Sequence, residues 1–267
     1  MREPLLTVEK LEVVYHRVAT AVHDVSFAVP RGKVVAVLGS NGAGKTTTLR
    51  AISGFIGLDN AHVTRGAITF ADRRIENLDP RAVAAMGVVL VPEREKVFEN
   101  LTVAENLEAA VMRRSGARSR GARTEMVYSY LPALARLRGR EAGYLSGGER
   151  QALGLGSALM CEPDLLLVDE MSLGLAPIIV ADLIERLRRI CQEQGLTALL
   201  VEQNAAVALD VADYIYVMEN GRIVFSGGPN ALLKHQDIRE FYLGHGGRER
   251  RSYRDVKQYR KRARWYG

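Results

Sequence analysis

Hydrophobic and polar residues alternate in two segments near the beginning of the chain. Residues 5–14 and 21–29 both have a period of two, with a turn between them, so each predicts a half-buried strand. Six shorter segments farther along also predict strands, and the most apolar of them are typical of strands buried on both faces of a sheet. They are Lys33–Leu38, Gly66–Phe70, Val88–Val91, Leu165–Val168, Thr197–Val201 and Tyr214–Val217.

Helical patterns fill the intervals between these strands. The clearest run from Lys45 to about Ser53 and from Ile178 to Cys191. Asp79 and the proline after it are typical of the cap and first turn of a short helix, Arg81–Met86. Strands that alternate with helices indicate an α/β protein whose parallel sheet is covered on both faces.

The longest helical stretch covers residues 102–160, where apolar residues recur three and four positions apart. One segment within it, Arg113–Arg123, is small, basic and without this period. We therefore expect residues 113–123 to form an exposed loop between helices.

Length and composition favour a soluble globular protein. The chain has 267 residues, of which 47% are hydrophobic and 25% charged, and this is enough for a full α/β core. Its apolar runs are shorter than the about 18 residues of a membrane-spanning helix, and its first residues lack the pattern of a signal peptide. Cys161 and Cys191 belong to no metal-spaced cluster, so we expect two free thiols in a reducing cytosol.

The net charge of +6 is concentrated at the end of the sequence. Residues 247–267 contain nine Lys or Arg residues and two acidic ones, which leaves the rest of the chain close to neutral. The basic isoelectric point therefore describes a tail, and we expect no nucleic-acid-binding surface on the folded body.

A glycine-rich segment between a predicted strand and a predicted helix has the pattern G-x-x-x-x-G-K-T. Backbone N–H groups in such a loop surround phosphate oxygens, and the start of the helix adds partial positive charge. We expect Lys45 to bridge the β- and γ-phosphates of a nucleotide and the Thr46 hydroxyl to bind Mg²⁺. The residues of this predicted phosphate site are Gly39, Ser40, Asn41, Gly42, Ala43, Gly44, Lys45 and Thr46.

Four apolar residues, Leu165–Val168, lead directly into two acids, Asp169 and Glu170. A buried strand that ends in a carboxylate places Asp169 beside the Mg²⁺ of a phosphate site. Glu170 would lie on the other side of the strand end, where it could polarise a water molecule aimed at the γ-phosphate. Such a pair is a weak signal alone and a strong one in a chain that also has a phosphate loop.

A second pair of glycines, in Leu145–Gln151, precedes a predicted helix, Glu149–Met160. It again presents backbone N–H groups to an anion, although an ordinary serine-capped helix start would use the same residue types. A chain with one phosphate loop needs a second such site only if that site serves the nucleotide of another subunit. With this L-S-G-G-E segment, the chain resembles the nucleotide-binding domains of ABC transporters over residues 5–244.

The resemblance implies a particular fold and division of the chain. The fold would be that of a P-loop NTPase, with a parallel sheet core, an N-terminal antiparallel β subdomain and a helical signature subdomain at about residues 95–160. The ATP-binding domain would cover residues 1–245, followed by the basic tail at 246–267.

The resemblance also implies further nucleotide contacts. In this family two domains dimerise head to tail, and each ATP lies between one P-loop and the signature of the partner. Ser146, Gly147 and Gly148 would therefore face the γ-phosphate held by the partner. Tyr15 matches the aromatic residue that stacks on adenine, with a plain surface tyrosine as the alternative, and Thr47 would extend the phosphate loop.

Three positions depart from the commonest family pattern. Glu93 and Glu149 stand where many members have glutamine, and Gln203 stands where most have a switch histidine. Glu93 would bind Mg²⁺ or water, and Gln203 would donate a hydrogen bond to the γ-phosphate without carrying a proton as histidine does. Together, V-P-E, L-S-G-G-E, S-L-G-L-A-P and V-E-Q-N-A resemble the ATPases of branched-chain amino acid importers and of their urea, amide and aromatic-acid relatives.

This kind of importer implies a set of partners and cofactors. The chain would bind ATP and Mg²⁺ at the cytoplasmic face of the inner membrane, paired with a second ABC ATPase or with itself. The pair would contact two permease subunits that a periplasmic binding protein supplies, and these partners, rather than this chain, would select the solute. The tail would be a solvated extension, a contact to anionic lipid or permease loops, or a segment that binds single-stranded nucleic acid.

Three rival functions share part of the pattern. The ATPase of a lipid or polysaccharide exporter would have the same ATP site, so its permease alone would distinguish it. A translation or DNA-repair ABC protein would bring a second ATPase domain or long coiled-coil or zinc insertions, which this sequence lacks. A P-loop GTPase would need an N-K-x-D motif, which the sequence also lacks. The sequence therefore favours the importer.

Overall fold

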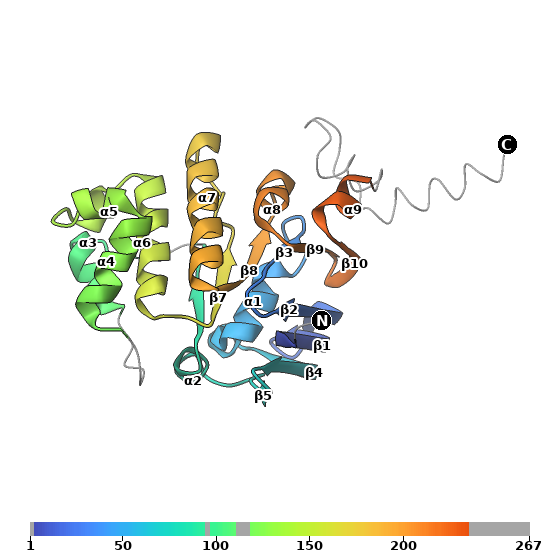
Figure 1. Cartoon of the computed structure of the whole chain (residues 1–267). Coiled ribbons are helices and arrows are strands. Elements are labelled where there is room, and N and C mark those ends of the chain that lie inside the picture. The colour runs from blue at the N-terminus through green and yellow to red at the C-terminus, as the bar shows by residue number, and fades with distance from the viewer. Residues whose placement is uncertain (1–2, 94–96, 111–117, 235–267) are drawn as a thin grey trace, which may run out of the picture.

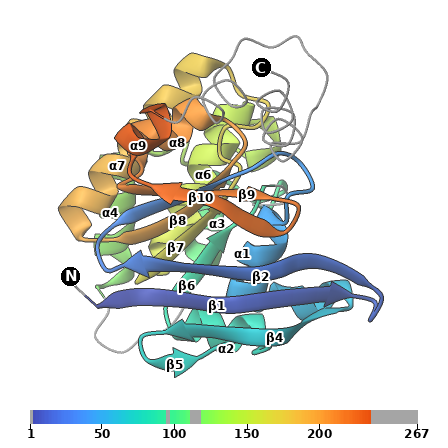
Figure 2. The same cartoon turned by 90° about the vertical axis from the view of Figure 1, so that its right-hand side faces the viewer.

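The N-terminal strands pair with each other in an antiparallel sheet, as their alternating pattern predicts. Buried positions on β1 face the core while the intervening ones are more exposed, and the sheet has the order β2-β1-β4-β5 (Figure 2). The computed structural model describes residues 3–93, 97–110 and 118–234. The strands of this sheet are β1 (Pro4–Tyr15), β2 (Ala19–Pro30), β4 (Ala61–Phe70) and β5 (Arg73–Arg74).

A second sheet of six strands, in the order β10-β9-β3-β8-β7-β6, forms the centre of the molecule. Five of its strands are parallel and β10 is antiparallel to β9, so the predicted α/β class with a parallel core is confirmed. The edge strand β10 was not predicted. The strands are β3 (Val34–Leu38), β6 (Val88–Val91), β7 (Leu165–Asp169), β8 (Thr197–Glu202), β9 (Tyr214–Glu219) and β10 (Arg222–Gly227).

Helices cover both faces of the six-stranded sheet (Figure 1). On one face α1 lies between this sheet and the antiparallel one. On the other face α6, α7 and α8 lie side by side, and α3, α4 and α5 pack against α6. The short helix η1 (Phe55–Asp59) follows α1, and η2 (Ala142–Tyr144) precedes α6. The α-helices are α1 (Lys45–Ser53), α2 (Pro80–Ala85), α3 (Val103–Ala109), α4 (Arg120–Tyr130), α5 (Pro132–Arg136), α6 (Gly147–Met160), α7 (Pro177–Gln194), α8 (Ala205–Val211) and α9 (Pro229–Lys234).

The apolar strand β7 separates two hydrophobic cores. Leu166 and Val168 pack with the helices α3 to α7, whereas Leu165 and Leu167 on the opposite face pack with α1 and the antiparallel sheet. All four side chains are fully buried, which explains why the run is apolar at every position. The end of β7 is therefore packed on both faces, which fixes the position of its last residue, Asp169, and of Glu170 directly after it.

The expectation of an exposed loop at 113–123 is wrong for its last part. Ser119 caps α4, which begins at Arg120. The Arg123 side chain is buried, lies 3.2 Å from a carboxylate oxygen of Glu162 and donates a hydrogen bond to the Met160 carbonyl. This basic residue therefore packs inside the protein because an acid far along the chain compensates its charge. Residues 111–117 of the expected loop lie outside the described residues.

The predicted tail, 246–267, also lies outside the described residues, so its three interpretations and the domain boundary at 245 stay predictions. In the described part of the chain, no helix is both long and apolar enough to cross a membrane. Neither Cys161 nor Cys191 forms a disulfide, as the sequence predicts.

Candidate active site

The loop from β3 to α1 is shaped by its glycines. A Cβ atom at Gly39 would lie 2.6 Å from the carbonyl oxygen of Met218, and one at Gly44 would lie 2.9 Å from that of Ala21. Gly44 also has φ of 103°, a conformation that favours glycine. Since α1 begins directly after Gly44 without a side-chain cap, its first N–H groups remain available to an anion. This geometry fits a phosphate cradle.

The Lys45 ammonium lies inside this loop. Its Nζ donates to the carbonyl oxygens of Gly39, at 3.0 Å, and Ser40, at 3.2 Å. It also forms an ion pair with Glu170 Oε1 at 3.1 Å, and the two side chains are only 3% and 10% exposed. Lys45 of the predicted phosphate site therefore forms an ion pair with Glu170, the predicted general base.

Thr46 and Asp169, two of the three predicted Mg²⁺ ligands, are in contact. The Thr46 hydroxyl donates to Asp169 Oδ1 at 3.1 Å, across the junction of α1 and the end of β7. The described residues contain no cluster of three acidic, His or Cys side chains that could hold a metal alone. One hydroxyl and one or two carboxylates beside a phosphate loop do fit Mg²⁺, because this ion keeps several water ligands and shares substrate phosphates.

Burial raises the pKa of Asp169 to about 6, against the hydrogen bond from Thr46, which lowers it. The negative charges of Glu170 and Glu93 raise this pKa further, and Lys45 lowers it. A divalent cation at this position would remove that penalty, because it favours the ionised carboxylate.

We expect Asp169→Asn to stabilise the metal-free protein at neutral pH. A carboxyl group whose pKa is higher in the folded than in the unfolded state costs stability as the pH rises from about 4 to about 6, and a shift from 3.8 to about 6 corresponds to at most about 3 kcal/mol. Urea unfolding with a chelator at pH 5.0 and 7.5 measures the effect. The advantage of the asparagine variant should be larger at pH 7.5, and a pH-independent difference would contradict this origin.

The remaining predicted residues on this side of the molecule lie at strand ends. Tyr15 ends β1, is half-buried, and its hydroxyl lies 3.2 Å from that of Thr47 on α1. It therefore borders the phosphate loop instead of standing free on the surface. Glu93 follows β6, close enough for its charge to act on Asp169, and the exposed Gln203 follows β8. The carboxyl ends of β3, β6, β7 and β8 thus gather the predicted residues at one edge of the sheet.

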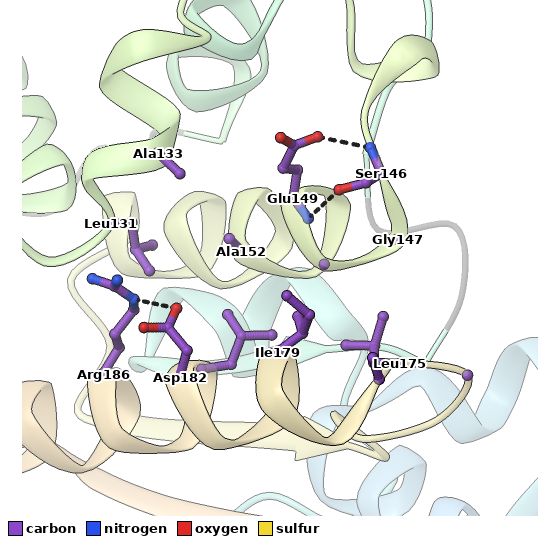
Figure 3. A pocket seen from close by; sticks show the side chains of 14 residues that line it. Leu131, Ala133, Ser146, Gly147, Glu149, Ala152, Leu175, Ile179, Asp182 and Arg186 are labelled. Atoms are coloured by element: carbon purple, nitrogen blue, oxygen red, sulfur yellow. Dashed lines mark hydrogen bonds and ion pairs between the residues drawn. The ribbon is translucent and has the colours of Figure 1, made fainter.

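The second glycine pair begins a helix two residues earlier than predicted. Ser146 caps α6, its Oγ accepts from Glu149 N at 3.4 Å, and the Glu149 carboxylate accepts from Ser146 N at 2.8 Å (Figure 3). Glu149 thus closes a reciprocal capping box, a role that the usual glutamine could also perform. The serine cap is the alternative that the sequence itself offers for this segment, whereas the return bond from Ser146 N to Glu149 was not predicted.

Gly147 and Gly148 lie against the beginning of α7. A Cβ atom at Gly148 would lie 2.5 Å from Ile179 Cγ2, and one at Gly147 would lie 3.1 Å from a methyl group of Leu175. Beside these glycines lies a cavity of about 440 Å³, which residues of both α6 and α7 line (Figure 3). Close packing is therefore one reason for glycine at both positions, and the contact of Ser146, Gly147 and Gly148 with a nucleotide of a partner stays a prediction.

Comparison with known proteins agrees with this geometry. The family model described as ABC transporter matches residues 22–172. The chain is 39% identical to the high-affinity branched-chain amino acid transport ATP-binding protein BraG of Pseudomonas aeruginosa, over 90% of this chain and 100% of that protein. It is 34% identical to the probable branched-chain amino acid transport ATP-binding protein LivF of Archaeoglobus fulgidus, over 83% and 91%.

A lipopolysaccharide export system ATP-binding protein, LptB of Acidithiobacillus ferridurans, is 33% identical over 90% of this chain and 97% of that protein. Among solved structures, an ATP-binding cassette of an ABC transporter in its ADP conformation superimposes with a TM-score of 0.78. It is 27% identical, and the match covers 91% of this chain and 100% of the other. ATP-binding proteins of branched-chain amino acid transport and of lipopolysaccharide export therefore both resemble this chain along most of its length.

Proposed function

Because this chain belongs to the ABC transporter family and is one of its ATP-hydrolysing subunits, we propose that it powers the import of branched-chain amino acids or related small solutes. The main support is the 39% identity to a branched-chain amino acid transport ATP-binding protein along that protein's entire length. The V-E-Q-N segment, which begins in β8, supports the same assignment. The exporter remains the second candidate, supported by a relative with 33% identity.

We propose the following division of labour in the ATP site. Backbone N–H groups of the phosphate loop and the Lys45 ammonium hold the β- and γ-phosphates, while Thr46, Asp169 and Glu93 hold Mg²⁺ directly or through water. When bound there, Mg²⁺ would supply positive charge against the phosphates. Glu170 takes a proton from the attacking water.

Three further contacts complete the proposed site. Tyr15 stacks on adenine after its hydroxyl leaves Thr47, and Gln203 donates a hydrogen bond to the γ-phosphate. Ser146, with the two glycines after it, contacts the nucleotide of a second subunit. That subunit is another copy of this chain or a similar ABC ATPase, and the pair contacts two permeases at the cytoplasmic face of the membrane.

Uptake measurements in the organism that encodes this chain test the proposal. Its gene is deleted, and the uptake of labelled leucine, urea, a short amide and an aromatic acid is compared with that of the parent strain. We expect at least one uptake to fall to background and to return with the normal gene but not with Glu170→Gln. Unchanged uptake of all four solutes, together with impaired lipopolysaccharide export, would favour the exporter instead.

A further inference from the structure

The buried residue Glu202 connects the phosphate loop with the loop that follows β7. It is the last residue of β8 and only 1% exposed. Its Oε1 accepts from the Ser172 backbone N–H at 3.2 Å, and its Oε2 accepts from the Ser172 hydroxyl at 2.7 Å. Both carboxylate oxygens therefore hold one residue of the loop that follows β7.

The main chain of Glu202 makes a second connection. Its carbonyl oxygen accepts from the N–H of Gly39, the first residue of the phosphate loop, at 3.2 Å, where Leu38 and Glu202 are neighbours in the parallel register of β3 and β8. One residue thus ties the phosphate loop to the segment after the acidic pair. A movement of Ser172 relative to the phosphate loop must break these bonds or move the end of β8.

The backbone between these anchors is strained at Glu170. This residue has φ of 45°, a left-handed conformation that is unfavourable for a residue with a side chain and persists only where its surroundings enforce it. Its own N–H donates to the Val201 carbonyl at 3.0 Å, and two residues later Ser172 is held by Glu202. Both anchors belong to β8, and the residue between them, Met171, is fully buried.

The charge of Glu202 requires these hydrogen bonds. Burial raises the pKa of its carboxyl group, the bonds from Ser172 and the Met171 backbone lower it, and the nearby charge of Glu170 raises it again. A buried acid in such surroundings is costly unless its oxygens are satisfied, as they are here. Replacement of a whole buried polar group and its partners by apolar residues is often neutral or stabilising, so the presence of this buried glutamate is weak evidence for a role in stability alone.

We propose that Glu202 is a positioning residue: it holds the strained turn that carries Glu170 and so fixes the direction of that carboxylate toward the phosphate loop. The inference rests on the proposed role of Glu170 as the general base. It assigns to Glu202 a task separate from that of Gln203 beside it, because Glu202 acts within its own subunit and through Ser172.

Two substitutions at position 202 test the positioning. In Glu202→Leu neither bond to Ser172 can form, and we expect kcat for ATP hydrolysis to fall by about 10²-fold, the cost of a misplacement of about 1 Å, while KM changes by less than about threefold. In Glu202→Gln the amide can accept from the Ser172 N–H and donate to its hydroxyl, so kcat should stay within about threefold of the parent. Equal losses in both variants would overturn the proposal, and so would normal kcat in the leucine variant.

A matched control and a double variant separate positioning from general damage. Glu162→Leu removes another partly buried acid, the partner of Arg123, and should lower stability without changing kcat. In a Glu170→Gln background, Glu202→Leu should cause no further loss, because the group that it positions is already absent. Should the leucine variant fail to fold, Ser172→Ala removes one of the two bonds and should lower kcat by about 3- to 10-fold with ATP binding retained. Normal kcat in Ser172→Ala would then overturn the proposal.

Normal turnover in the single variant Glu170→Gln would contradict the proposed role of Glu170 as the base. The hydrogen bonds of Glu202 would then have no catalytic role through Glu170. A loss in Glu170→Gln without a loss in Glu202→Leu would contradict the positioning role only. The two proposals therefore fail by different results.

Discussion

Glu170→Gln should slow ATP hydrolysis by about 10²- to 10⁴-fold, the contribution of a positioned general base. Glutamine keeps the size of the side chain but cannot take a proton from water. ATP should bind at least as tightly as to the parent, because the Lys45 ammonium is no longer held by a carboxylate at 3.1 Å. Steady-state turnover and calorimetric titration with ATP measure the two quantities.

ATP-bound dimers of this variant should accumulate, because in the proposed arrangement two subunits share the nucleotide and the variant does not consume it. Gel filtration with ATP and Mg²⁺ would detect them. The conservative variant Glu170→Asp serves as the control. It keeps a carboxylate on a shorter side chain and should therefore retain more activity than Glu170→Gln. Turnover of Glu170→Gln close to that of the parent would place the base elsewhere.

Lys45→Met should abolish detectable hydrolysis and destabilise the empty protein by about 3 kcal/mol. The loss of stability follows because Glu170 remains buried without its cation, and removal of one partner of a buried ion pair leaves an uncompensated charge. ATP affinity should fall by about 10- to 100-fold, since charge-assisted hydrogen bonds are worth about 1.5–3 kcal/mol.

The double variant Lys45→Met/Glu170→Gln separates these effects. It should recover most of the lost stability, because no buried charge is left unpaired, but none of the lost ATP affinity. Urea unfolding of the parent, both single variants and the double variant gives the coupling energy of the pair. A double variant no more stable than Lys45→Met would mean that the ion pair contributes nothing in the empty protein.

Local signals in the sequence predicted most of the fold because they depend on neighbours along the chain. The cap at Asp79 and the strand-loop-helix around Lys45 are examples, and both match the structure. The edge strand β10 was missed because it is paired on one side only and its residues are half-buried, which blurs the period of two.

Contacts between distant residues could not be predicted in the same way. The local pattern around Arg123 predicts a basic loop. Its burial could not be predicted, because this burial depends on Glu162, which follows α6 in the sequence. The role of Glu202 could not be predicted, because its partner, Ser172, is 30 residues away. For the candidate site, the sequence predicted which residues gather at the sheet edge, whereas the pairing of Lys45 with Glu170 needed the three-dimensional arrangement.

The tight approach of Gly148 to Ile179 limits how this chain can diverge from its relatives. A β-carbon at position 148 would be 2.5 Å from the Ile179 side chain, so even alanine requires that side chain to shrink or turn away. A substitution at position 148 is therefore coupled to the size and orientation of the side chain at position 179. In a mutational library, alanine at 148 should be tolerated when residue 179 is smaller than isoleucine. If nucleotide binding also requires glycine at 148, this requirement becomes measurable only in such a background.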